Sequence, residues 1–339
     1  MSQLRDRIQS IEKLGHYLSH ISENDPQYAP FFKAIENAQL QNGWFKKEDC
    51  LLAFQSWGAA LHPDKIAKWI SDYPLKENSN PKTIAVIMAG NIPLVGLHDL
   101  ISIWISGNNA LVKCATKDRI LIPFIVSNDP LLAALTEFTE GPLESFDAVI
   151  ATGSNNAARY FDHYFSKYPN VIRKNKNAVA VLDGSETADD LEGLGKDILQ
   201  YYGLGCRNVS KLYLPKNYDL NQVFGGLYPF AKNIDMNKYA NNYDYNKAVY
   251  LMSGFDFLEN GFFMLREEKT ISSPIATAHY EFYDALEPLI AHLEDQKNNI
   301  QCIVSNSTLP GAIRFGEAQN PELWDYADGV DTLSFLNSL

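Results

Sequence analysis

Apolar residues recur at steps of three and four along the first part of the chain, the spacing of one face of an α-helix. The clearest run contains Leu4, Ile8, Ile11, Leu14, Leu18 and Ile21. A later segment, CLLAFQSWGAALHPDKIAKWISDY, has a similar pattern, and Pro63 divides it because proline interrupts a helix interior. We therefore predict helices up to about residue 75, followed by a domain boundary in the polar stretch KENSNPK, residues 76–82.

From Thr83 the pattern changes to short, continuously apolar runs that alternate with helical segments. The runs are TIAVIMAG, NALVKCA, DAVIATG and AVAVLDG. Strands that are apolar throughout are typical of a parallel sheet covered on both faces. The pattern predicts a doubly wound α/β domain, which binds ligands at the carboxyl ends of its strands. The commonest dinucleotide fingerprint, GxGxxG, is absent from the sequence.

A second α/β domain is expected after about residue 206. The sequence there becomes rich in Tyr and Asn, with a strand-like NKAVYLMSG, a polar helix near FYDALEPLIAHLEDQ and a strand QCIVSN. The predicted organisation is a helical region over residues 1–78, a dinucleotide-binding domain over 79–205 and a catalytic domain over 206–339.

Composition narrows the classes of partner. The 339 residues are 46% hydrophobic and 21% charged, with a net charge of -12, which gives no general attraction to nucleic acid or to an anionic membrane. The four cysteines are scattered without CxxC pairs, so neither a metal site nor a disulfide framework is indicated. The amino end lacks an apolar signal region, and no stretch reaches about 20 uninterrupted apolar residues. We expect a cytoplasmic protein with reduced thiols.

The stretch YYGLGCRNVS, residues 201–210, places Cys206 between a glycine and an arginine directly after a predicted helix. One interpretation is a reactive thiol, because flanking glycines allow tight turns and close approach of other groups. The other is a helix that ends at Gly203 or Gly205, with Cys206 starting a buried strand.

Five short motifs occur in the order that they have in the aldehyde dehydrogenase superfamily. They are Asn91-Ile92-Pro93-Leu94, Ser106-Gly107-Asn108 through Val112-Lys113, Thr152-Gly153-Ser154, Lys176-Asn177 before AVAVLDG, and Gly205-Cys206. The closing RFGEAQNPELWDYADGVDTLSFL is similar to that of the bacterial acyl-CoA and acyl-protein thioester reductases within this superfamily. The chain resembles these reductases over roughly residues 84–336, and the resemblance implies an aldehyde dehydrogenase-like fold with a helical region added at its amino end.

The resemblance also implies roles for single residues. Cys206 is the expected nucleophile, and Asn91 with the Cys206 N–H would stabilise the oxyanion formed when the thiolate attacks a thioester. Asn91 could instead be a turn residue before proline. His163 is a candidate base, against the alternative of a half-buried helix histidine, and Glu268 (or Glu267) is a candidate for holding the nicotinamide ribose.

The cofactor site is expected at two strand ends. Lys113 would reach the adenosine ribose or its phosphate, and Gly153 and Ser154 open a helix whose N–H groups suit a pyrophosphate. Relatives that prefer NAD have a glutamate three residues after this lysine, where this chain has Thr116, followed by Lys117. Because a carboxylate would repel a 2′-phosphate, NADPH is the expected cofactor, with NADH possible.

One departure from the superfamily concerns the release of product. Members that oxidise aldehydes carry a Glu-Leu-Gly-Gly segment, whose glutamate activates water, where this chain has Ile172, Arg173, Lys174 and Asn175. Without that base an acyl-enzyme should exchange with a thiol carrier. We therefore expect reduction of an acyl-CoA or acyl-carrier protein to an aldehyde by a homo-oligomer. The alternatives are a CoA-acylating aldehyde dehydrogenase and a non-catalytic binding subunit.

Overall fold

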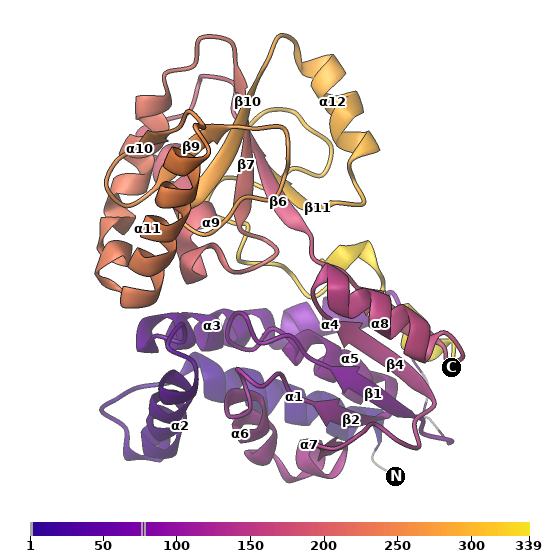
Figure 1. Ribbon diagram of the computed structural model, residues 1–339. Helices are drawn as coiled ribbons and strands as arrows, with labels where there is room; N and C mark the ends of the chain where they lie inside the picture. Colours follow the sequence, from indigo (N-terminus) through magenta and orange to yellow (C-terminus); the bar gives the residue numbers. More distant parts are fainter. Residues whose placement is uncertain (1–2, 76, 78) are drawn as a thin grey trace. The chain divides into compact units, whose positions relative to one another are not determined.

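The computed structural model describes residues 3–75, 77 and 79–339. Its contacts divide the chain into two compact units. Unit 1 contains Met1–Asn175 and Glu322–Leu339, and unit 2 contains Lys176–Pro321 (Figure 1).

Unit 1 begins with the helices that the periodicity predicts. They are α1 (Leu4–Ser19), the short 3₁₀ helix η1 (Pro26–Tyr28), α2 (Ala29–Gln41), α3 (Lys47–Ala60) and α4 (Pro63–Ser71). Pro63 occupies the first turn of α4, where its missing N–H costs no hydrogen bond, so the predicted break at this proline is confirmed. The predicted boundary at 76–82 includes residues 76 and 78, which lie outside the described part of the chain.

The sheet of unit 1 is parallel throughout, with the strand order β3-β2-β1-β4-β5. Its strands are β1 (Thr83–Ile87), β2 (Asn109–Lys113), β3 (Thr136–Phe138), β4 (Ala148–Thr152) and β5 (Asn170–Arg173). The connecting helices are α5 (Leu97–Ser106), α6 (Leu121–Ser127), α7 (Pro130–Ala134) and α8 (Asn155–Phe165). Strands and crossover helices alternate as predicted, which confirms the doubly wound α/β class.

Helix α8 covers one face of this sheet (Figure 1). Ala85, Val149 and Ala151 point towards it and pack with Phe161 and Phe165. Small side chains on the strands leave room for the aromatic rings of the helix, so α8 can lie close to β1 and β4.

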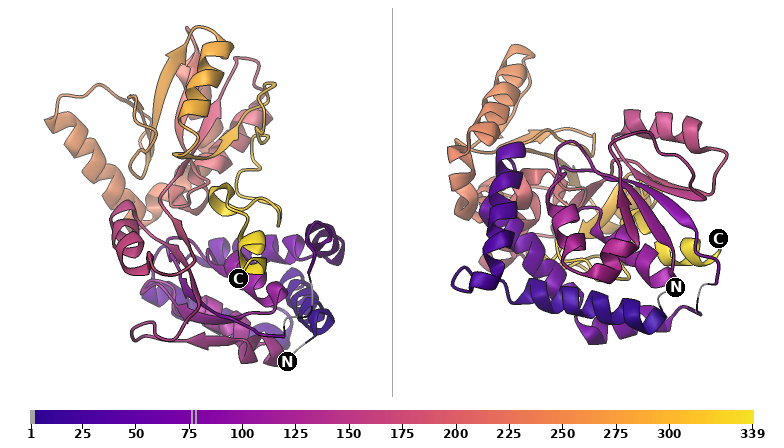
Figure 2. Two further views of the ribbon diagram at one scale, coloured as in Figure 1. Left: turned by 90° about the vertical axis from the view of Figure 1, so that its right-hand side faces the viewer. Right: turned by 90° about the horizontal axis from the view of Figure 1, so that it is seen from below.

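The carboxyl-terminal segment returns to unit 1. It contains the 3₁₀ turn η4 (Ala327–Gly329) and α13 (Thr332–Asn337), which packs against α5. The Trp69 indole N–H donates to the Tyr326 hydroxyl over 2.7 Å, and Lys65 pairs with Glu322 over 2.8 Å. Figure 2 shows this yellow segment beside the indigo amino-terminal helices. The two ends of the chain therefore help to build one unit.

Unit 2 contains a second sheet with the order β11-β6-β7-β10-β9-β8, parallel except for the pair β8 and β9. Its strands are β6 (Asn177–Val181), β7 (Val209–Pro215), β8 (Leu258–Glu259), β9 (Met264–Glu267), β10 (Thr277–Tyr283) and β11 (Ile300–Val304). Its helices are α9 (Ala188–Leu199), η2 (Gln200–Gly203), α10 (Leu220–Leu227), η3 (Tyr228–Asp235), α11 (Asn237–Met252) and α12 (Leu286–Asp295).

Two expectations about this half of the chain need correction. The segment NKAVYLMSG, which was expected to be a strand, lies mostly in helix α11, because Tyr239, Tyr243 and Tyr250 recur at helical spacing and are buried together. The strand AVAVLDG was assigned to the dinucleotide-binding domain, but β6 pairs with β7 and β11, so it and α9 belong to unit 2. Within the described residues, no helix combines the length and the apolar composition needed to cross a bilayer.

Candidate active site

Cys206 lies between α9 and β7, three residues after a strained turn. The helix ends at Leu199, and three consecutive residues then adopt left-handed backbone conformations: Tyr201 (φ 51°), Tyr202 (φ 59°) and Gly203 (φ 76°). For a residue other than glycine this conformation costs about 1 kcal/mol or more. Cys206 follows the turn and is half-buried. Strain of this kind persists only where the surrounding contacts hold it in place.

Three side chains of unit 2 bind backbone groups around Cys206, at the end of α9 and in the 316–318 loop. The buried Asn208 amide bonds to the end of α9 and to Gly205. Arg207 donates through Nε to the Ala318 carbonyl. The Asp197 carboxylate accepts from the Gly316 N–H at 2.7 Å and from the Ala318 N–H at 3.0 Å, and burial raises its pKa to about 6. The guanidinium that the sequence places beside Cys206 therefore binds a backbone carbonyl of the 316–318 loop.

Asn91 lies in unit 1, on the loop that follows β1, and is half-buried. This loop packs tightly on the loop after β2: a Cβ added to Gly90 would lie 2.7 Å from the Ala115 Cβ. The buried Asp118 carboxylate accepts from the backbone N–H of Leu94, which has a left-handed conformation with φ 61°. Burial raises the pKa of Asp118 to about 6. These contacts thus hold the Asn-x-Pro-Leu loop against the loop that follows β2.

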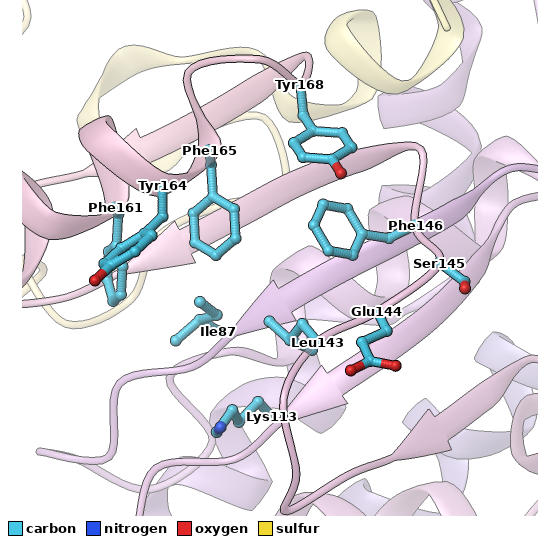
Figure 3. Close-up of a pocket in the computed structure, with 10 residues that line it drawn as sticks. All are labelled: Ile87, Lys113, Leu143, Glu144, Ser145, Phe146, Phe161, Tyr164, Phe165 and Tyr168. Carbon is cyan, nitrogen blue, oxygen red and sulfur yellow. The ribbon is translucent and has the colours of Figure 1, made fainter.

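A cavity of about 650 Å³ opens at the carboxyl ends of β1 and β2. Figure 3 shows aromatic side chains of α8 and the loop after it on one side, and the connection from β3 to β4 on another. The lining residues are Ile87, Lys113, Leu143, Glu144, Ser145, Phe146, Phe161, Tyr164, Phe165 and Tyr168. An apolar, aromatic cavity with a few polar groups is the usual form of a small-molecule site.

Lys113 contributes a cation to this cavity, at the end of β2, where its ammonium donates to the Gly141 carbonyl over 2.9 Å. Thr116 and Lys117 lie on the exposed turn beyond the strand, and the Thr116 carbonyl accepts from the Gln41 amide. Glu144 was not singled out by the sequence, because an exposed glutamate in a loop resembles ordinary surface. Only the packing of the loop brings its carboxylate to the same cavity as Lys113.

Gly153 and Ser154 lead into α8 as predicted. Ser154 is the N-cap, and its hydroxyl accepts from the Ala157 N–H at 3.3 Å. A Cβ at Gly153 would lie 2.9 Å from the Phe161 ring, so glycine allows the turn to pack on its own helix. A cation, a capped helix N-terminus and aromatic walls suit an adenosine linked to a pyrophosphate. The residues of unit 1 therefore fit a nicotinamide dinucleotide.

The remaining candidates do not line this cavity in the described part of the chain. His163 is exposed on α8, with its ring against Tyr164. Glu268 follows β9 in unit 2 and accepts from Arg266 at 2.9 Å and from the Lys269 N–H at 2.8 Å. Hydrogen bonding from the Thr270 N–H is the main cause that lowers the pKa of Glu268.

Two further histidines are structural. The His98 Nε2 lies 2.9 Å from the Leu323 carbonyl, and His279 Nδ1 lies 2.9 Å from the Thr270 carbonyl. Burial lowers the pKa of both rings. His279 is buried in unit 2 and His98 is half-buried in unit 1, and a backbone carbonyl of its own unit lies against each ring.

Arg173 stands in the segment that corresponds to Glu-Leu-Gly-Gly, at the end of β5. Its guanidinium is buried and donates to both carboxylate oxygens of Asp99 at 2.7 Å and to the Thr332 hydroxyl at 2.7 Å. This position thus holds a structural ion pair of unit 1.

Comparison with known proteins gives a result for the fold. No protein-family model matches the chain, and no curated protein matches it. Among solved structures, the indole-3-acetaldehyde dehydrogenase of P. syringae in complex with NAD+ aligns with a TM-score of 0.66 and 11% identity, over 91% of this chain and 73% of that chain. A Mycobacterium tuberculosis aldehyde dehydrogenase complexed with NAD+ gives 0.64 and 13%, over 91% and 75%.

An NADP-dependent enzyme of E. coli gives a TM-score of 0.64 and 11% identity, over 91% of this chain and 74% of that chain. Sequence identities this low carry information about architecture alone. The two units, their parallel sheets and these alignments together show that the chain has an aldehyde dehydrogenase-like fold.

Proposed function

We propose that the protein reduces an acyl thioester to an aldehyde with a nicotinamide cofactor, through an acyl group carried on Cys206. The observation that carries this proposal is a half-buried cysteine after a strained, hydrogen-bonded turn and before a strand of an aldehyde dehydrogenase-like fold. Strained backbone held by specific contacts is a feature of functional sites. The solved neighbours named above are dehydrogenases or cofactor-dependent enzymes, which supports the same class of chemistry.

The reaction needs two bond exchanges at one carbon atom. The Cys206 thiolate attacks the carbonyl carbon of the thioester, and the bond to the sulfur of the carrier breaks, which releases the carrier thiol after it takes up a proton. The nicotinamide cofactor supplies the hydride that reduces the carbonyl carbon. The bond to the Cys206 sulfur then breaks, the thiolate is restored and the aldehyde leaves.

Asn91 has the role of oxyanion donor in this proposal, together with the Cys206 N–H. An amide side chain is a neutral donor, so it can stabilise the developing negative charge without changing its own protonation state. The packed loop that carries Asn91 supports the assignment, because a donor that is held in place needs little reorganisation during the reaction.

The exit by hydrolysis is disfavoured. At the end of β5 the chain has a buried arginine engaged with Asp99 and Thr332. In the family comparison Ile172 stands at the position of the glutamate, directly before this arginine. Neither an isoleucine nor an arginine can accept a proton from water, so the segment provides no general base there. Exchange with a thiol carrier, either CoA or a carrier protein, is the remaining route by which the acyl group arrives or departs.

For the cofactor we propose a preference for NADPH. Lys113 would hold the adenosine end, and the N-terminus of α8 with Ser154 would hold the pyrophosphate. Thr116 leaves the turn after β2 without the carboxylate that would repel a 2′-phosphate, and Lys117 is exposed beside it. Glu144 places a carboxylate on another wall of the cavity. Because a carboxylate can bind a free 2′-hydroxyl, we retain NADH as a second cofactor.

The decisive experiment follows NADPH oxidation against a series of acyl-CoAs from acetyl to palmitoyl, with the aldehyde identified directly. We expect oxidation that depends on the thioester and yields one aldehyde for each NADPH. Aldehyde formation by the Cys206→Ala variant at the wild-type rate would contradict the proposal. Oxidation that proceeds without a thioester would contradict it as well.

Two alternatives to the proposed function can be tested in the same way. A CoA-acylating aldehyde dehydrogenase runs the same chemistry in the opposite direction, and equal rates of NADP+ reduction with aldehyde and CoA would favour it. A non-catalytic binding subunit is suggested by the absence of the family's glutamate, whose place is taken by Ile172. Radiolabelled acyl-CoA should leave a hydroxylamine-labile adduct on an enzyme, whereas a binding subunit should never form one.

A further inference from the structure

The backbone around Cys206 is unusual because a helix ends directly before a left-handed turn. Helix α9 finishes at Leu199, and the last carbonyl groups of a helix lack the N–H partners that a further turn would supply. Buried carbonyl groups need other donors. In this structure one side chain from beyond the turn provides donors to several of these groups.

That side chain is Asn208, which is 2% exposed. Its Nδ2 donates to three carbonyl groups at the end of α9, those of Asp197 at 3.0 Å, Ile198 at 3.2 Å and Gln200 at 2.9 Å. With two hydrogens for three acceptors, one of these bonds is shared. Asn208 therefore acts as the terminal cap of α9, although it lies nine residues after the helix ends.

Asn208 also holds Gly205 from both sides. Its Oδ1 accepts from the Gly205 N–H at 2.8 Å, and its backbone N–H donates to the Gly205 carbonyl at 3.1 Å. The Gly205 carbonyl and the Cys206 N–H belong to the same planar trans peptide, so they point in opposite directions. Fixing the carbonyl therefore fixes the direction of the Cys206 N–H.

We propose that Asn208 is a positioning residue for the nucleophile, which sets the orientation of the Gly205–Cys206 peptide and of the thiol attached to it. The proposal rests on the proposed function, since it assigns Asn208 a role through Cys206. The turn that delivers the thiol stores backbone strain, and the amide network of Asn208 keeps this turn in one conformation.

Two variants separate positioning from plain stability. Asn208→Ala removes the contacts to Gly205 and to α9 that the side chain makes. Asn208→Asp keeps an acceptor for the Gly205 N–H but presents a carboxylate to three carbonyl oxygens, which favours the neutral acid. The neutral acid can donate one hydrogen bond, so this variant should regain part of the wild-type behaviour as the pH falls.

The measurement is the rate at which iodoacetamide alkylates Cys206 in the full chain, followed by mass spectrometry of the peptide that contains it. Cys302, which is also half-buried in unit 2, provides an internal reference in every digest. We expect Asn208→Ala to slow alkylation of Cys206 by about fivefold or more and to leave Cys302 unchanged. For Asn208→Asp, the rate relative to wild type should rise between about pH 8 and about pH 6.

Leu293→Ala is the matched control, because it removes a buried side chain of α12 in the same unit and lowers stability without touching the turn. An alkylation rate of Cys206 in folded Asn208→Ala equal to wild type would overturn the proposal. An equal loss in Leu293→Ala would overturn it too. If Asn208→Ala does not fold, the pH trend of Asn208→Asp decides alone, and a flat ratio would refute the inference.

Steady-state rates keep this outcome distinct from that of the proposed function. Failure to reduce any acyl-CoA would remove the proposed function, whereas the alkylation assay would still report on the orientation of the thiol. If the reduction is observed, Asn208→Ala should lower kcat by about tenfold with KM for the cofactor unchanged.

Discussion

The sheet of unit 1 is parallel and that of unit 2 is parallel except for the pair β8 and β9, but the two units use these sheets in different ways. In unit 1 the groups that suit a cofactor gather at the carboxyl ends of β1, β2 and β4, where Lys113, the Asn91 loop and the start of α8 follow adjacent strands. In unit 2 the cysteine precedes its strand, at the amino end of β7. The first arrangement is the general one for doubly wound sheets, whereas the second depends on side-chain contacts around the turn.

The difference shows what each kind of site requires. A binding site at strand ends obtains its shape from the sheet itself, so a few side chains on short loops are sufficient. The proposed nucleophile follows a left-handed turn, and in unit 2 the amide of Asn208 binds the backbone on both sides of that turn. The carboxylate of Asp197 fixes the neighbouring 316–318 loop. Substitutions in unit 1 should therefore change cofactor binding, and those in the turn should change covalent chemistry.

The largest effect is expected at Cys206. Cys206→Ala should abolish acyl transfer, and Cys206→Ser should retain trace activity at most, because the proposed mechanism uses the Cys206 thiolate as the nucleophile. Cofactor affinity, measured by quenching of intrinsic fluorescence, should stay near wild type since the cavity lies in unit 1. Acyl-CoA reduction at wild-type rates by both variants would contradict the assignment of the covalent step to Cys206 in unit 2.

Asn91→Ala tests whether unit 1 also takes part in the chemical step. Loss of one oxyanion donor should lower kcat by roughly 100-fold, equivalent to about 3 kcal/mol of transition-state stabilisation, with little change in KM. The measurement is steady-state kinetics beside thermal unfolding. A lower melting temperature with unchanged turnover would show that Asn91 is only a turn residue.

The two buried carboxyls give each unit its own pH response. Burial raises the pKa of Asp118 in unit 1 and of Asp197 in unit 2 to about 6. Compared with the unfolded chain, the folded state thus favours the protonated carboxyl. The contribution of each group to the free energy of unfolding is fully present below the unfolded pKa of 3.8 and is lost as the pH rises through about 6. This loss amounts to about 2 to 3 kcal/mol for each group.

Asp197→Asn and Asp118→Asn should abolish this part of the pH dependence. The free energy of unfolding, measured by urea denaturation, should increase for each variant relative to wild type between about pH 4 and about pH 7. Asp295→Asn, at an exposed end of α12, is the control and should show no such trend. A constant difference for both buried sites would mean that folding raises the pKa of neither carboxyl.

Cofactor choice gives a smaller effect, confined to unit 1. Thr116→Glu should move the ratio of kcat/KM for NADPH and NADH towards NADH by roughly tenfold, because the new carboxylate repels a 2′-phosphate. Lys113→Ala should weaken both cofactors equally and serves as the comparison. A wild-type preference for NADH, or an unchanged ratio in Thr116→Glu, would place the adenosine elsewhere.

The smallest change is expected for Glu144, since its side chain is exposed on the rim of the cavity. Glu144→Gln should raise the affinity for NADPH relative to NADH a few-fold, and Lys117→Ala should lower it by a similar amount, because solvated charges interact weakly. Titration with each cofactor and with ADP-ribose at low ionic strength is the measurement. Identical shifts for both cofactors would exclude a contact with the 2′ position.

Much of unit 1 could be predicted from sequence because its signals are local. Continuous apolar runs followed by Gly, Asn or Lys mark β1, β2 and β4, and the parallel arrangement brings their ends together. Unit 2 was harder to predict. Helix α11 contains a strand-like run of residues, and its helical character depends on tyrosines that are buried against the rest of the unit.

The sequence by itself determined the class of the fold, the order of the strand-end motifs and the candidacy of Cys206, since each follows from residue types at short spacing. Tertiary structure alone decided which sheet β6 joins, how Arg173 is engaged, and which groups line the cavity with Lys113. It also decided that Asn208 caps α9 and holds Gly205. These are contacts between groups whose geometry depends on the folded path of the chain, and a hydrogen bond requires that geometry to within a few tenths of an ångström.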